Sequence, residues 1–149
     1  MYNKSLVLSS VAIAIAYAAP AHAGESYAEV RGGYVWQGRF NSASVGAAVG
    51  RNWQIGANQF VGVEGSVDKA TSRGGEYVWA LSGRLGTKVA ANGRAYVTGG
   101  FSHAEAGSAT HLGVGYQRAL TGSIYLKGEY RHMFNDRGDM VLTGIGFAF

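Results

Sequence analysis

The chain has 149 residues, enough for one domain, and contains no cysteine, so disulfide frameworks and thiolate metal sites are excluded. Its net charge of +4 comes from scattered Lys and Arg residues without a basic run, which argues against nucleic-acid binding. The 24 glycines follow no Gly-X-Y period, and nine Tyr, six Phe and three Trp argue against a disordered chain.

The first residues have the pattern of a signal peptide. Lys4 precedes the apolar stretch LVLSSVAIAIAYAA, and a small-x-small cleavage site follows at AHA, residues 21–23. The apolar stretch ends at Pro20 and is short for a membrane-spanning helix, so a retained N-terminal anchor is only the alternative. We therefore expect residues 1–23 to be a cleaved signal peptide and residues 24–149, which lack proline, to form the mature domain.

The rest of the sequence alternates between apolar and polar or small residues and has no sustained helical periodicity. Clusters of Gly, Asn, Ser and Asp separate eight such stretches, and the short connections require consecutive strands to pair in antiparallel fashion. The fold class is therefore all-β. In chain order the expected strands are Tyr27–Gln37, Ser44–Trp53, Phe60–Lys69, Tyr77–Lys88, Arg94–His103, His111–Gln117, Ile124–Met133 and Val141–Phe149.

Each expected strand has one apolar face and one face of charged, polar or very small residues. In the first strand, Val30, Tyr34 and Trp36 alternate with Glu29 and Arg31. Two architectures share this pattern: a soluble barrel or sandwich with its apolar face inside, and a transmembrane barrel with its apolar face toward lipid. Alternation alone does not distinguish them.

The aromatic residues favour the membrane barrel. If odd-numbered strands run outward from the periplasm, the rings of the apolar face gather near the two ends of the strands, with aliphatic residues between them. Amphipathic rings lie at headgroup level in membrane barrels, whereas a soluble core would place its rings toward the middle. The predicted interface residues are Tyr34, Trp36, Tyr77, Trp79, Phe101 and Tyr130 at the outer rim and Trp53, Tyr116, Phe147 and Phe149 at the inner rim.

The opposite face carries equal numbers of acidic and basic residues, together with many glycines. In the narrow lumen of an eight-stranded barrel, small residues make room for long ones, and opposite charges pair. An ordinary solvated surface is the alternative, although glycine weakens a strand and is unusual on such a face. The predicted polar network of the lumen consists of Glu29, Arg31, Glu64, Asp68, Arg84, Lys127, Glu129 and Arg131.

The last eight residues, LTGIGFAF, resemble the C-terminal assembly signal of bacterial outer-membrane barrels. Gly144, Phe147 and Phe149 match this signal, while Leu142 occupies a position that is usually polar. The stretch LKGEYRHMFNDRGDMVLTGIGFAF is similar to the last hairpin of the opacity-protein/OmpA-type barrels. The resemblance implies an eight-stranded antiparallel up-and-down transmembrane β-barrel in the outer membrane of a Gram-negative bacterium. It also implies contact with outer-membrane lipid, and assembly by the barrel-insertion machinery and periplasmic chaperones.

Catalysis has little support in the sequence. A few small barrels modify outer-membrane lipid, and the stretch HMFND places His132 near Asp136. The serine that lipid deacylases carry two residues after the histidine is Phe134 here, so the nucleophile is missing. The histidines at 103 and 111 show no metal-ligand spacing and are expected in loops or at interfaces. We therefore expect no enzyme, no cofactor, no metal and no small-molecule substrate.

The expected function is that of a small integral outer-membrane barrel with a structural or surface-antigen role. The outer connections, near residues 37–43, 69–76, 102–110 and 134–139, are short and offer little surface to a large ligand. Long charged side chains are expected to fill the lumen. A narrow or gated pore is the first alternative, followed by a lipid-modifying enzyme and a soluble periplasmic barrel.

Overall fold

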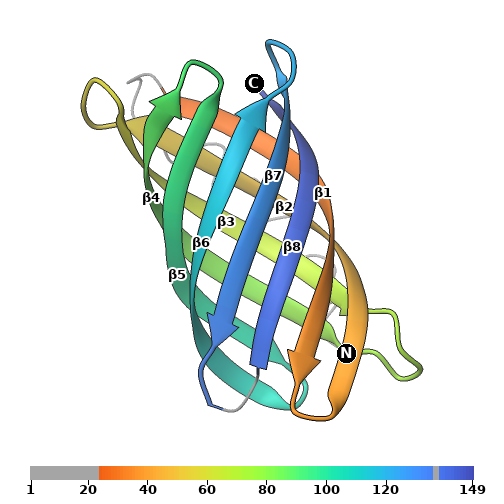
Figure 1. Ribbon diagram of the computed structural model, residues 1–149. Helices are drawn as coiled ribbons and strands as arrows, with labels where there is room; N and C mark the ends of the chain where they lie inside the picture. The colour runs from red at the N-terminus through yellow and green to blue at the C-terminus, as the bar shows by residue number, and fades with distance from the viewer. Residues whose placement is uncertain (1–23, 136–137) are drawn as a thin grey trace, which may run out of the picture.

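The computed structural model describes residues 24–135 and 138–149, and the predicted signal peptide lies outside the described residues. Eight strands form one closed antiparallel barrel in which β8 pairs with β1 (Figure 1). The predicted fold class, an all-β, eight-stranded antiparallel up-and-down barrel, is therefore confirmed. The strands are β1 (Gly24–Gln37), β2 (Phe40–Gln54), β3 (Gln59–Ala70), β4 (Tyr77–Ala90), β5 (Gly93–Ala104), β6 (Gly107–Ala119), β7 (Ile124–Met133) and β8 (Gly138–Ala148).

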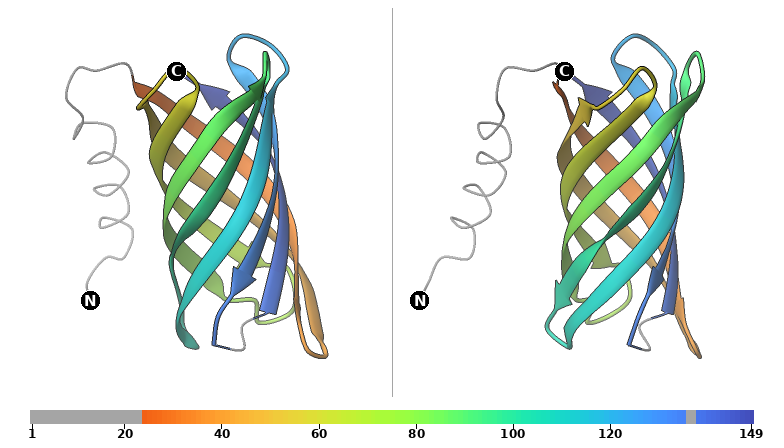
Figure 2. Two further views of the ribbon diagram at one scale, coloured as in Figure 1. Left: turned by 60° about the vertical axis from the view of Figure 1, so that its left-hand side comes forward. Right: turned by 90° about the vertical axis from the view of Figure 1, so that its left-hand side faces the viewer.

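β1 begins and β8 ends at the same end of the barrel, here named the terminal end; the opposite end is the distal end (Figure 2). The expected distal connections at 37–43 and 102–110 are wrong in extent, because β1 and β2 join through Gly38 and Arg39 alone, and β5 and β6 through Glu105 and Ala106. Gly38 has φ 57°, a left-handed conformation that tight hairpin turns require. The strands continue past the expected bounds because polar residues such as Asn41 pair in the ladder although they do not alternate with apolar ones.

No helix among residues 24–135 and 138–149 is both long and apolar enough to cross a membrane.

Two backbone hydrogen bonds close the barrel at its C-terminus. The N–H of Ser26 donates to the carbonyl of Phe149 at 3.0 Å, and the N–H of Phe149 donates to the carbonyl of Ser26 at 2.8 Å. From there β8 pairs with β1 as far as the partners Asp139 and Trp36. Closure gives each of the eight strands a neighbour on both sides, as a structure in lipid requires.

The register sets the tilt of the strands. A row of paired residues that leaves β3 at Lys69 passes through every other strand and returns to β3 at Gln59, ten residues away. For eight strands at ordinary spacings this displacement gives a tilt of about 40°. Figure 2 shows the strands crossing the barrel obliquely. The interior of such a barrel is wide enough for side chains and little more.

Four aromatic rings point into the barrel near the terminal end, and each lies over a glycine of the next strand. All four rings are at most 4% exposed. A Cβ atom on any of the four glycines would overlap the ring opposite. The arrangement occurs once in each hairpin, and these rings were not among the residues predicted for the interior. The cross-strand pairs are Tyr27–Gly50, Phe60–Gly86, Tyr96–Gly115 and Tyr125–Gly146.

Candidate functional site

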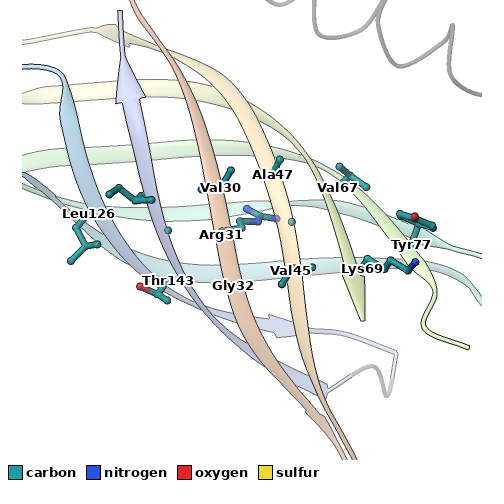
Figure 3. A pocket seen from close by; sticks show the side chains of 13 residues that line it. Val30, Arg31, Gly32, Val45, Ala47, Val67, Lys69, Tyr77, Leu126 and Thr143 are labelled. Carbon is teal, nitrogen blue, oxygen red and sulfur yellow. The ribbon is translucent and has the colours of Figure 1, made fainter. Parts of the chain in front are cut away.

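The outer surface of the barrel is apolar. Aliphatic side chains in the middle of the strands point outward and are largely exposed, as Val30 (63%) and Leu81 (56%) illustrate. Figure 3 shows one part of this surface, a shallow groove of about 800 Å³. A soluble monomer rarely exposes so continuous an apolar surface, whereas lipid would cover it. The groove is lined by Val30, Val45, Ala47, Val67, Leu126 and Ile145, among others.

The ten aromatic residues predicted at the membrane interface lie on the outer face of the strands. Phe147 and Phe149 stack at the terminal end with ring centroids 6.2 Å apart. Gly144, the remaining residue of the predicted assembly signal, faces the lumen and pairs with Arg31. The distal group is Tyr34, Trp36, Tyr77, Trp79, Phe101 and Tyr130, and the terminal group is Trp53, Tyr116, Phe147 and Phe149.

The eight charged residues predicted for the lumen all lie inside the barrel and are at most 6% exposed. Four carboxylates face four cations, so these residues contribute no net charge to the interior. Buried ions are tolerated when they are paired and hydrogen-bonded. The residues are Glu29, Arg31, Glu64, Asp68, Arg84, Lys127, Glu129 and Arg131.

Glu64 lies at the centre of this network and is 1% exposed. Its Oε1 accepts hydrogen bonds from Arg31 Nη1 and Arg131 Nη2, both at 3.1 Å. Its Oε2 accepts hydrogen bonds from Tyr27 Oη at 2.7 Å and from Lys127 Nζ at 3.4 Å. Lys127 and Arg131 come from β7, which is opposite β3 in the order of strands around the barrel. The Glu64 carboxylate therefore links strands across the full width of the lumen.

The other three carboxylates each have a cation within direct contact. Arg31 donates two hydrogen bonds to Asp68, one of them from Nε at 2.9 Å. Charge-assisted contacts of this kind are the stronger class of hydrogen bond and compensate part of the cost of burial. The pairs are Glu29–Lys127, Asp68–Arg31 and Glu129–Arg131.

Tyrosine hydroxyls complete the network from the terminal side. Besides Tyr27, Tyr96 Oη donates to Glu129 at 2.6 Å and Tyr125 Oη donates to Glu29 at 2.8 Å. These three donors were not among the predicted lumen residues, although strand parity offered a signal. Tyr27 stands two residues before Glu29, and the other two tyrosines likewise occupy inward positions of their strands.

Arg84 is held mainly by rings. Its guanidinium carbon lies 4.0 Å from the ring centroid of Tyr96 and 5.2 Å from that of Tyr27. Arg84 Nη1 also donates a hydrogen bond to Tyr27 Oη at 2.7 Å, and it is 3.8 Å from Glu64 Oε2. Cation–π contacts thus stabilise Arg84, which lies next to the aromatic rings at the terminal side of the network.

Separate cavities lie at the two ends of the lumen. The distal cavity has a volume of about 540 Å³ and is lined by residues of all eight strands. Two cavities at the terminal end measure about 140 and 260 Å³, and both are lined by Glu25 and Arg94, which form a two-pronged ion pair at 2.8 and 3.0 Å. The distal and terminal cavities share no lining residue, and the network around Glu64 lies between them.

His111 differs from expectation in its position, and His132 has a partner that was not expected. His111 points into the lumen rather than lying at an interface, with Nε2 2.9 Å from Ser82 Oγ and Nδ1 3.0 Å from Ser102 Oγ. His132 lies on the outer face near the distal end, and its Nδ1 is 2.7 Å from Asp139, a partner that was not predicted. Among the described residues, no group of three or more His, Cys, Asp or Glu side chains is placed to hold a metal ion.

A closed eight-stranded barrel with an apolar exterior, aromatic residues toward both ends and a charged lumen is a transmembrane β-barrel in its fold. Solved structures share this fold. The attachment invasion locus protein Ail of Yersinia pestis matches with a TM-score of 0.64 and 10% identity over 86% of this chain and 99% of its own. The N-terminal β-barrel domain of Pseudomonas aeruginosa OprF matches with a TM-score of 0.63 and 15% identity, over 85% and 100%.

Neisserial surface protein A is similar to the same degree, with a TM-score of 0.61 and 11% identity over 84% of this chain and 95% of its own. At these identities the similarity concerns the fold. No protein-family model matches the chain, and no curated protein matches it in sequence.

Proposed function

We propose that this protein is a small integral barrel of the outer membrane of a Gram-negative bacterium, with a structural or surface-antigen role and no catalytic activity. The observation that carries the proposal is the lumen, which Glu64 and its partners fill with buried, paired charges. The apolar exterior supports contact with outer-membrane lipid. The two-residue turns at 38–39 and 105–106 leave little surface for a large ligand.

In this proposal the terminal end faces the periplasm and the distal end faces the exterior. Residues 1–23 direct export and are removed, and periplasmic chaperones and the barrel-insertion machinery assemble the remainder. The position of Phe147 near the end of β8 and of Phe149 directly after it, with both rings exposed at the terminal rim, supports their role as the assembly signal.

Cell fractionation tests the proposal. The protein is expected in the outer-membrane fraction, to migrate differently on gels before and after boiling, and to be detected by antibody against the 71–76 connection on intact cells. Recovery in the soluble periplasmic fraction without detergent would contradict it and would favour the soluble barrel.

A narrow or gated pore is the second candidate, because cavities approach the network from both ends. Planar-bilayer recording separates the two functions. We expect no steady current from the inserted protein. A steady current that falls in Ser66→Leu, which adds volume inside the lumen, and persists in Gly128→Leu, which adds it on the outer face, would establish the pore instead.

A lipid-modifying enzyme has weaker support. His132 lies on the outer face with Asp139 beside it, but the neighbouring side chain is the ring of Phe134, whose centroid is 5.0 Å from that of His132. A hydroxyl nucleophile would have to take that place. Release of fatty acid from outer-membrane lipid by the purified protein, lost in His132→Ala, would overturn the proposal of no catalysis.

A further inference from the structure

We propose that the distal cavity is a binding site for a medium-sized, uncharged apolar molecule that carries one hydrogen-bonding group, such as an alcohol or a ketone. The inference rests on the proposed function only in that the distal end is taken to face the exterior. The cavity has a volume of about 540 Å³, which lies within the range of pockets that bind small molecules.

The walls of the cavity are largely apolar, although Gln37 and several serines also line them and the lumen is polar farther down. Aliphatic side chains from β1, β4, β5, β7 and β8 contribute to these walls, and most of the lining side chains are short, so the space between them stays open. If the distal cavity contacted only water, its walls would not need aliphatic side chains. Pockets that bind apolar molecules, in contrast, are lined predominantly by such side chains. The aliphatic lining includes Val35, Val78, Ala80, Ala104, Met133 and Met140.

Ser44 provides a polar group that lacks a partner. It is 5% exposed and lines the cavity, and its Oγ makes no hydrogen bond to any described residue. A buried hydroxyl without a partner is destabilising. A change of the Ser44 rotamer that turns this hydroxyl toward the cavity would let a ligand with a donor or an acceptor form a hydrogen bond to it at little further desolvation cost. Ser102 Oγ, which also lines the cavity, is already engaged with His111.

The floor of the cavity excludes a charged ligand. Its two ionisable residues, Asp68 and Arg131, are paired within the network, Asp68 with Arg31 and Arg131 with Glu64 and Glu129. A carboxylate or ammonium group on the ligand would add a buried charge without a counterion. The remaining ionisable lining residue, Glu76, lies in the connection between β3 and β4 at the rim.

Thiol protection tests the site, because the chain has no native cysteine. Val35→Cys places one thiol inside the cavity, and Glu105→Cys places one in the β5–β6 turn outside it. Each variant, inserted in phosphatidylcholine nanodiscs, is treated with a water-soluble methanethiosulfonate reagent in the presence of nonan-1-ol or nonanoate. We expect nonan-1-ol to slow modification at position 35 several-fold, nonanoate to have little effect, and position 105 to react at the same rate throughout.

Three further substitutions in the Val35→Cys background, one of them a control, examine the contacts. Ser44→Ala should raise the nonan-1-ol concentration for half-protection about three- to tenfold, the effect of one hydrogen bond. Ala80→Phe fills the cavity and should abolish protection, whereas Ala47→Phe on the lipid-facing surface should not. Heat-modifiable migration verifies that each variant is folded.

Three results would overturn the inference: no protection of a folded Val35→Cys variant, equal protection at positions 35 and 105, or protection by nonanoate as strong as by nonan-1-ol. None of them bears on the proposed function, which fractionation and conductance decide separately.

Discussion

Rings and glycines occupy complementary positions inside the barrel. Tyr125 lies directly opposite Gly146, and any side chain at 146 would overlap its ring. Because Tyr125 also donates to Glu29, the space above Gly146 determines whether that hydrogen bond can form. Glycine is normally unfavourable in a strand, and here the packing of a large ring on the neighbouring strand offsets that cost.

Gly146→Val should therefore destabilise the barrel by about 1–3 kcal/mol, as overpacking of a close-packed interior does. The matched control is Gly128→Val on the adjacent strand, where no heavy atom lies within 4 Å of an added Cβ and valine suits a strand. Urea unfolding from lipid measures both. In a Tyr125→Ala background the effect of valine at 146 should shrink, because the obstructing ring is gone. Equal losses for the two glycines would contradict the packing argument.

Glu64 is the residue on which most of the charge pairing depends. Glu64→Gln leaves three carboxylates to face four buried cations, and we expect a loss of about 3–5 kcal/mol in the free energy of unfolding. Glu25→Gln, which breaks the half-exposed pair with Arg94, should cost about 1 kcal/mol or less. Urea unfolding from lipid measures the loss of unfolding free energy in both variants. Similar losses for Glu64→Gln and Glu25→Gln would mean that the centre of the lumen is solvated.

β8 closes the barrel. Phe149, the residue directly after β8, exchanges two backbone hydrogen bonds with Ser26 and also presents a ring at the terminal rim. The backbone of Phe149 thus closes the barrel, and its ring belongs to the proposed assembly signal. Deletion of Phe149 would remove both and would not separate their effects.

Phe149→Ala keeps the backbone and removes only the ring. If the ring is the assembly signal, this variant should be processed normally in cells yet give much less heat-modifiable barrel than the wild type. The purified variant should still refold in detergent, because its backbone pairs remain. Phe149→Tyr, which retains an aromatic ring, serves as the control and should assemble normally. Wild-type assembly of Phe149→Ala would contradict the role of the ring.

Strand positions could be predicted because the alternation of residues reports directly on the two environments. The ends of the strands could not, since ladder pairing continues through polar residues such as Asn41 that carry no alternation. The same parity placed the charged residues on one face. It did not reveal which of them touch, because contacts such as that between Lys127 and Glu64 depend on the closure of the barrel, which brings β3 and β7 face to face.

Over the whole molecule, the lumen is divided into three layers that no single strand displays. Rings over glycines occupy the terminal part, paired charges the middle and short aliphatic side chains the distal part. His111 belongs to this interior, although a loop or an interface was expected for it. Its strand carries Gly113 and Gly115 on the same face and Leu112 and Val114 on the other, so strand parity already indicates its inward direction. The sequence does not reveal its contacts with the serines of β4 and β5, because these depend on the register of three neighbouring strands.

Each strand presents one face to lipid and the other to the lumen, and accessibility of nitroxide labels along β3 tests this arrangement directly. Single cysteines at Val61, Val63, Ser66 and Val67, labelled and inserted in lipid vesicles, are compared by collisions with oxygen, which dissolves in lipid, and with a water-soluble nickel chelate. We expect labels at 61, 63 and 67 to be accessible to oxygen and shielded from nickel, and the label at 66 to be shielded from both. Free access of the nickel chelate to position 63 would contradict the account.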